Sequence, residues 1–257
     1  YNVAVGGWAL TGNTIGAKNS AFGYTALKAN TTGSDNSAFG YQALLYNTIG
    51  SSNSAFGFRS LQNNTTGTNN TAVGRSALQA NTIATDNSAF GYFSLGSNTT
   101  GIRNTAVGRS ALNANTTGPR NTAFGYNALG AGNGVLNTAV GDGPLRQLTS
   151  GENNVGIGSD AGVFVASGCH NISLGNESGY GVTTGCHNIG IGWLSQANLS
   201  SGSNNINIGC VSNSYTTNCN TIAIGNKAVN FPGATGTIVL GNSSVGGTGA
   251  CNSVVIG

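Results

Sequence analysis

Charged side chains are scarce in this sequence: nine basic and six acidic residues among 257, or 6%, where about 25% is usual in a soluble domain. The net charge of +3 is small and scattered. We therefore expect no nucleic-acid partner, because such binding depends on a concentrated basic surface. Long apolar runs are also missing. A membrane-spanning helix needs about 20 consecutive apolar residues, so we expect no membrane-spanning segment.

Carboxylates are too few to support a catalytic site. None of the six forms a recognisable pair with either of the two histidines, and histidine and carboxylates are the commonest general acids and bases. We therefore expect no enzymatic activity and no cofactor. The six carboxylates are Asp35, Asp86, Asp142, Glu152, Asp160 and Glu177.

Glycine, in contrast, is abundant, with 43 residues, and one set of glycines recurs at a strict period. The spacing is 17 residues, except for 16 residues from Gly125 to Gly141 and in each of the last three steps. This regularity argues against the disorder that such a composition often implies. We call this set the anchor glycines: Gly6, Gly23, Gly40, Gly57, Gly74, Gly91, Gly108, Gly125, Gly141, Gly158, Gly175, Gly192, Gly209, Gly225, Gly241 and Gly257.

The period predicts an all-β fold, a parallel β-solenoid or β-roll with one repeat in each of about 16 coils. Helical-hairpin repeats need about 33 residues or more, and propeller blades about 40. Coils that stack at the strand spacing of about 4.8 Å would form a rod on the order of 70 Å long. Residues 1–153 carry an Asn-Ser/Thr-Ala-Phe/Val-Gly subtype and residues 154–257 an Asn-Ile-x-Ile-Gly subtype. We expect one continuous rod, with a local irregularity within residues 130–153.

Positions around the anchor glycine alternate in character. One and three residues before it, late repeats carry pairs such as Ile222 and Ile224, a pattern typical of a strand with one buried face. We expect these residues to form the core, together with a leucine four residues after the anchor, such as Leu27. The Asn-Thr-Thr-Gly segments that follow, as at 30–33, predict turns in which stacked asparagine amides hydrogen-bond along the rod.

From Ala21 to Gly190, the opposite face of the same strand carries small residues. A row of alanine and glycine favours close approach by another backbone, and we interpret it as a subunit contact surface. The alternative is a tight internal turn within one coil. The candidate contact residues are Ala21, Gly23, Ala38, Gly40, Ala55, Gly57, Ala72, Gly74, Ala89 and Gly91.

Two short motifs resemble known fibre proteins. Segments 220–228 (Asn-Thr-Ile-Ala-Ile-Gly-Asn-Lys-Ala) and 252–257 (Asn-Ser-Val-Val-Ile-Gly) resemble head repeats of trimeric autotransporter adhesins. Segment 36–44 (Asn-Ser-Ala-Phe-Gly-Tyr-Gln-Ala-Leu) is similar to repeats of bacteriophage tail-fibre and related surface-fibre proteins. The first resemblance implies a homotrimer of left-handed parallel β-rolls that binds host matrix or cells. It also implies that the chain is one segment of a longer protein.

All five cysteines follow residue 168. Cys169 and Cys186 hold the same position in adjacent coils, which would place their Cα atoms about 5 Å apart, within disulfide range. Cys210 lies outside this column, and its candidate partners are Cys219 or another chain. Disulfides suit an extracellular protein; the alternative is small buried thiols. Neighbouring strand residues face opposite ways, so the histidine that follows each of Cys169 and Cys186 is not expected to join it in a metal site.

The column directly after the anchor glycine mixes aromatic residues and arginine. At stacking distance, arginine over tyrosine gives cation–π contacts worth about 0.5–1 kcal/mol when exposed. Two interpretations are open: structural stacking, or a stripe that binds a glycan or a protein of a host surface. The column, called the stripe below, consists of Tyr24, Tyr41, Phe58, Arg75, Tyr92, Arg109 and Tyr126.

Together these patterns predict a structural or adhesive segment of an extracellular fibre, on a cell surface or in a virion tail fibre, that associates with itself as a homotrimer. One alternative is a filament subunit that polymerises end to end. Another is an ice-binding solenoid, which a flat threonine array facing solvent would favour. Its candidate column contains Thr31, Thr65, Thr99 and Thr116 and is interrupted by Ile15, Ile49 and Ile83.

Overall fold

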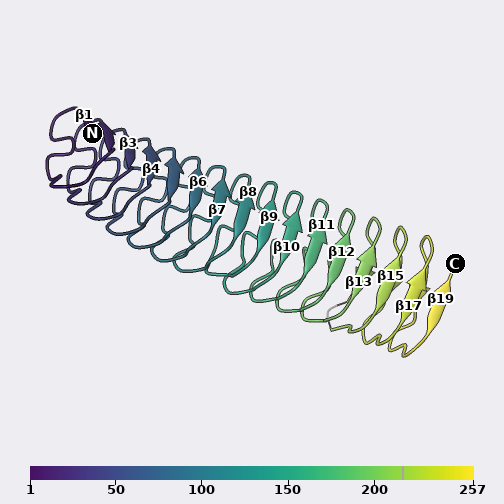
Figure 1. The fold of residues 1–257 in the computed structure, drawn as a ribbon. Helices are drawn as coiled ribbons and strands as arrows, with labels where there is room; N and C mark the ends of the chain where they lie inside the picture. The colour runs from purple at the N-terminus through teal and green to yellow at the C-terminus, as the bar shows by residue number, and fades with distance from the viewer. Residues whose placement is uncertain (216) are drawn as a thin grey trace. The chain divides into compact units, whose positions relative to one another are not determined.

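The computed structural model describes residues 1–215 and 217–257, which form two compact units, 1–133 and 134–257. Each unit is a parallel β-solenoid, and the two units together have about 15 turns at a spacing near 17 residues (Figure 1). We call each turn a coil. The solenoid fold inferred from the glycine period is therefore confirmed. The described residues contain no helix, and hence none that could cross a membrane.

Unit 1 contributes one three-residue strand per coil. Each strand pairs in parallel with its neighbour at an offset of 17 residues, as Ala38 pairs with Ala55. Short strands follow from the repeat, because the anchor glycine directly after each strand turns the chain. The strands are β1 (Val3–Val5), β2 (Ser20–Phe22), β3 (Ser37–Phe39), β4 (Ser54–Phe56), β5 (Thr71–Val73), β6 (Ser88–Phe90), β7 (Thr105–Val107) and β8 (Thr122–Phe124).

Unit 2 repeats this arrangement and adds a second sheet in its last coils, those with the 16-residue spacing. The main sheet contains β9 (Thr138–Val140), β10 (Val155–Ile157), β11 (Ile172–Leu174), β12 (Ile189–Ile191), β13 (Ile206–Ile208), β15 (Ile222–Ile224), β17 (Ile238–Leu240) and β19 (Val254–Ile256). The second sheet contains β14 (Asn213–Ser214), β16 (Val229–Asn230) and β18 (Val245–Gly246).

The middle residue of each strand points into the solenoid, and its two neighbours point outward. Ala21 is completely buried, whereas Phe22 beside it is 36% exposed. The interior has little room at this position: at Gly156, its counterpart in unit 2, an added Cβ would lie 2.9 Å from Leu145 Cγ. The prediction that the large residues before the anchor fill the core is therefore wrong. So is the assignment of the alanines to a subunit surface, since all five are fully buried within their own unit: Ala21, Ala38, Ala55, Ala72 and Ala89.

The anchor glycines meet another backbone, but it belongs to the next coil of the same chain. Gly57 has φ +137°, a region that disfavours residues with a Cβ. A Cβ built there would lie 2.6 Å from the carbonyl oxygen of Gly74. The same approach occurs at the other glycines assigned to subunit contacts, so the next coil accounts for glycine at these positions without a second chain: Gly23, Gly40, Gly57, Gly74 and Gly91.

The apolar core changes position between the units. In unit 1 it is the predicted leucine column four residues after the anchor, of which Leu27 and Leu78 are completely buried. In unit 2 the leucine column ends at Leu145. Buried aliphatic residues three positions further along the repeat follow it: Leu148, Val165, Val182 and Leu199.

Two ladders of buried asparagines run through unit 1. The first, in the predicted turns, is directional: Asn47 Nδ2 donates to Asn30 Oδ1 at 2.8 Å, and Asn64 Nδ2 donates to Asn47 Oδ1 at 2.7 Å. This confirms the turn ladder expected from the Asn-Thr-Thr-Gly segments. The second precedes each strand, where Asn36 donates its backbone N–H to Asn19 Oδ1 at 3.0 Å and its Nδ2 to Gly50 O at 2.8 Å. These buried asparagine side chains are thus hydrogen-bonded from coil to coil, which offsets the cost of their desolvation.

Candidate functional site

The stripe is an uninterrupted stack on the outside of unit 1. The Tyr41 ring lies 5.6 Å from that of Tyr24 and 5.3 Å from that of Phe58, with interplanar angles of 14° and 8°. The Arg75 guanidinium lies over Phe58 at 5.5 Å and over Tyr92 at 5.8 Å. Arg109 continues the stack, 5.8 Å from the ring of Tyr92 and 5.8 Å from that of Tyr126. The stacking and cation–π contacts expected from the sequence are therefore present.

Stacking covers the faces of the rings inside the stripe and leaves their edges in solvent. Tyr41 has an aromatic neighbour on each side, and Tyr92 has an arginine on each side. Yet Tyr41 is 41% exposed and Tyr92 is 47% exposed. The stripe therefore offers phenol hydroxyls, ring edges and guanidinium N–H groups to a ligand, and little free ring face.

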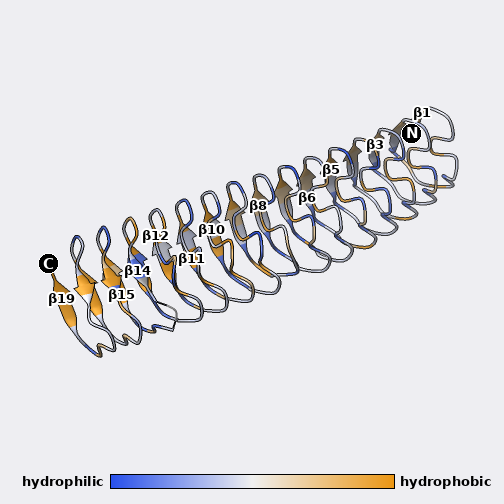
Figure 2. Cartoon of the chain, turned by 180° about the vertical axis from the view of Figure 1, so that it is seen from behind, coloured by the Kyte–Doolittle hydropathy of each residue, from blue (hydrophilic) through white to orange (hydrophobic). Residues whose placement is uncertain are grey.

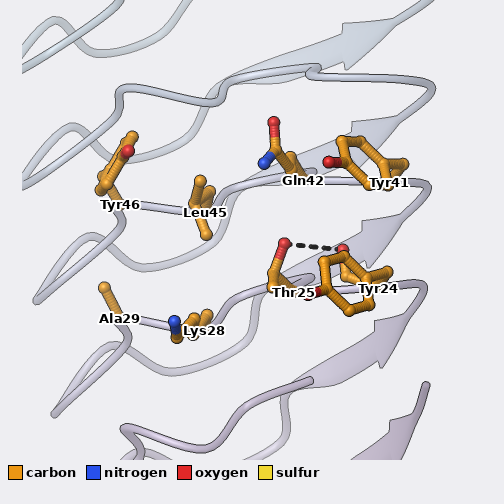
Figure 3. Close-up of a pocket in the computed structure, with 8 residues that line it drawn as sticks. All are labelled: Tyr24, Thr25, Lys28, Ala29, Tyr41, Gln42, Leu45 and Tyr46. Atoms are coloured by element: carbon orange, nitrogen blue, oxygen red, sulfur yellow. Dashed lines mark hydrogen bonds between the residues drawn. The ribbon is translucent and has the colours of Figure 1, made fainter. Parts of the chain in front are cut away.

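A shallow cavity of about 590 Å³ opens beside the first rings of the stripe. Figure 3 shows Tyr24 and Tyr41 one above the other on adjacent coils, with Thr25 and Gln42 next to them. The far wall comes from positions five and six residues after the anchors: Lys28, Ala29, Leu45 and Tyr46. This groove was not predicted. The signal that points to it is Tyr46, whose column otherwise holds small residues or asparagine in unit 1.

The outward side of the main sheet in unit 2 is aliphatic. Ile191 pairs in register with Leu174 and Ile208 on neighbouring strands and is 36% exposed. In Figure 2 the last strand, β19, is coloured as strongly hydrophobic. We call these two columns the aliphatic face: Val155, Ile157, Ile172, Leu174, Ile189, Ile191, Ile206, Ile208, Ile222, Ile224, Ile238, Leu240, Val254 and Ile256.

The threonines proposed for ice binding use their hydroxyls within the chain. Thr31 Oγ1 donates to Thr48 O, and Thr48 Oγ1 donates to Thr65 O, both at 3.0 Å. The column is also continuous, so the prediction that isoleucine interrupts it is wrong. Isoleucines such as Ile49 and Ile83 belong to the next column, which is exposed.

A disulfide joins Cys169 and Cys186 on adjacent coils of unit 2, with Cα atoms 4.7 Å apart. Cys210 and Cys219 are both free, so the pairing considered between them is absent. Cys251 is also free, and it is exposed, as is Cys210.

The residue after each disulfide cysteine is an exposed histidine. The His170 and His187 rings stack at 4.8 Å with an interplanar angle of 6°. Across the described residues, no group of three or more potential metal ligands gathers in one place.

Comparison with known proteins identifies no family: no family model matches the chain, and no curated sequence is detectably similar to it.

Proposed function

We propose that this chain is a non-catalytic structural and adhesive segment of an extracellular fibre, and that it assembles with copies of itself through the aliphatic face of unit 2. The observation that supports this proposal is the aliphatic face itself. Single exposed apolar residues are common on monomers, whereas contiguous apolar patches are typical of interaction sites. Seven paired strands carry these two columns without a charged residue.

A second copy of the same chain suits this surface best. Outward side chains repeat once per coil, at a spacing of about 4.8 Å. A partner must present side chains at a matching spacing to interdigitate with them, and another copy does so by construction. Sheets that pack face to face do so about 10 Å apart through such residues. The motif at 220–228, which resembles trimeric adhesin heads, is what favours three copies.

The disulfide supports the extracellular part of the proposal, because such bonds persist mainly in oxidising compartments. The stripe supports the adhesive part, since exposed tyrosine and arginine are enriched where proteins bind partners. The internal use of the threonine hydroxyls gives ice binding no comparable support.

Light scattering after size-exclusion chromatography tests the assembly. We expect a fixed mass near three times the 25.5 kDa of one chain. The Ile191→Glu variant should dissociate while keeping its far-UV circular dichroism, because this side chain points outward. The matched control, Thr184→Glu, adds the same charge at an exposed position outside the aliphatic face and should keep the wild-type mass.

A wild-type monomer at micromolar concentration would overturn the assembly proposal. A mass that grows steadily with concentration would indicate end-to-end polymerisation instead. If Ile191→Glu kept the wild-type mass, the interface would lie elsewhere.

A further inference from the structure

We propose that the stripe and the adjacent groove of unit 1 bind a linear anionic polysaccharide, recognised through its sulfate or carboxylate groups. This inference deepens the adhesive part of the proposed function and does not depend on the self-association of unit 2. Three observations carry it: the charge distribution of unit 1, the position of its stripe arginines between aromatic rings, and the coverage of the ring faces.

Charge is distributed unevenly within unit 1. Seven basic and two acidic side chains give this unit a net charge of +5. Both acids, Asp35 and Asp86, lie in the column five residues before the anchors. The stripe and the positions that follow it in the repeat carry only cations, so an anion that approaches there meets no carboxylate. These cations are Lys28, Arg59, Arg75 and Arg109.

Aromatic rings flank each of the two stripe arginines. Arg75 lies between Phe58 and Tyr92, and Arg109 between Tyr92 and Tyr126. Rings on both sides limit the directions in which each guanidinium can present its N–H groups. Both arginines are exposed, and neither is in an ion pair with a carboxylate among the described residues. A planar, pre-oriented guanidinium binds sulfate or carboxylate in a bidentate manner and loses little conformational freedom on doing so.

The spacing of the cations suits a polymer that runs along the stack. Arg75 and Arg109 are two coils apart, or about 10 Å at the strand spacing. Arg59 lies on the coil before Arg75 and is held in place by donating its Nε–H to Gln42 Oε1 at 3.0 Å. Gln42 also lines the groove, together with Lys28. Guanidinium groups and the groove therefore follow one another along one side of the unit.

Covered ring faces favour a polysaccharide over a nucleic acid. Proteins that bind single-stranded nucleic acid stack bases on free aromatic faces, and here those faces are occupied by the neighbouring coils. Tyrosine hydroxyls at the ring edges, as at Tyr41 and Tyr92, are suited instead to hydrogen bonds with sugar hydroxyls.

Binding of dextran sulfate, measured by calorimetry beside neutral dextran of the same length and a single-stranded RNA, tests the proposal. We expect dextran sulfate to bind, neutral dextran not to bind, and RNA to bind more weakly than dextran sulfate. Affinity should fall as NaCl is raised from about 50 to about 200 mM. Binding releases the cations that are condensed on the polyanion, and added salt opposes that release. The Arg75→Gln/Arg109→Gln variant should lose at least about tenfold in affinity, as expected for the loss of charge-assisted hydrogen bonds.

The matched control is Arg103→Gln/Arg120→Gln. It removes the same charge from two exposed arginines of the same unit, in the column five residues before the anchors, and should change the affinity less than threefold. Equal losses in the two double variants, tighter binding of RNA, or no binding of dextran sulfate would each overturn the proposal. Light scattering on the same samples separates the two hypotheses: a monomer that binds dextran sulfate refutes self-association and leaves this inference standing.

Discussion

Removal of one amide from the buried turn ladder tests the contribution of hydrogen bonding between coils. Asn64 donates through Nδ2 to Asn47 Oδ1 at 2.7 Å and to Gly67 O at 2.9 Å. It accepts from Asn81 Nδ2, also at 2.7 Å. In Asn64→Ala, Gly67 O keeps a second donor, Asn53 Nδ2, at 2.8 Å. The Asn47 oxygen and one N–H of Asn81 lose the partner that Asn64 provides.

Two orphaned polar groups set the magnitude. A buried group without a partner costs about 1–3 kcal/mol, so Asn64→Ala should lower the free energy of unfolding of unit 1 by about 2–6 kcal/mol. The matched control is Asn63→Ala, the same change at the preceding residue. Asn63 is only half-buried, and its column holds alanine at Ala29 and Ala80. We expect that control to stay within about 0.5 kcal/mol of wild type.

Urea denaturation followed by far-UV circular dichroism gives the global value. Hydrogen exchange of the amides near residue 64 gives the local free energy of unfolding. The local value is needed because repeat proteins can unfold in parts. Asn64→Leu separates hydrogen bonding from volume, since Leu148 occupies the equivalent position in unit 2. The leucine variant should be destabilised about as much as the alanine variant. The reasoning would be refuted if the free energies of unfolding of Asn64→Ala and Asn63→Ala differed by less than about 1 kcal/mol.

Two further predictions concern backbone packing and covalent linkage. Gly57→Ala should destabilise unit 1 strongly, because its Cβ would lie 2.6 Å from Gly74 O. Gly247→Ala, whose Cβ would meet only Ala250 at 4.0 Å, should be tolerated; similar urea midpoint shifts for both would contradict this. Replacing both Cys169 and Cys186 with alanine should cost about 3 kcal/mol, the entropy of a loop of this length. Reductant should lower the urea midpoint of the wild type, and it should leave the midpoint of the double variant unchanged because that variant has no disulfide to reduce.

The position of the core shows where sequence patterns become ambiguous. Alternation along a strand such as Ile222–Ile224 separates two faces but does not say which one is inside. Hydrophobicity suggested the large residues, and the structure places Ala223 inside, completely buried. Variation in side-chain size from coil to coil indicates more reliably which face of the strand is outside. The residue before the anchor switches between Phe56 and Val73 on adjacent coils, a change that a close-packed interior does not tolerate.

The candidate site also has parts that the sequence could predict and one part that it could not. The stripe could be predicted because residues 17 apart in the sequence become neighbours in any solenoid with that period. The disulfide between Cys169 and Cys186 follows from the same register. The groove beside Tyr24 could not be predicted, because it depends on how far Lys28 and Tyr46 stand from the stripe.

By itself, the sequence determined the architecture: parallel β-strands, one coil per period, anchor glycines in register, asparagine ladders and a shortage of charge. All of these follow from translational repetition, because each side chain lies about 4.8 Å from its own near-copy, and like charges at that distance repel. Only the tertiary structure decided which side of each strand is inside. The interior at this position is filled by Ala21 beside a leucine column, so the larger apolar residues lie on the outside of the coil.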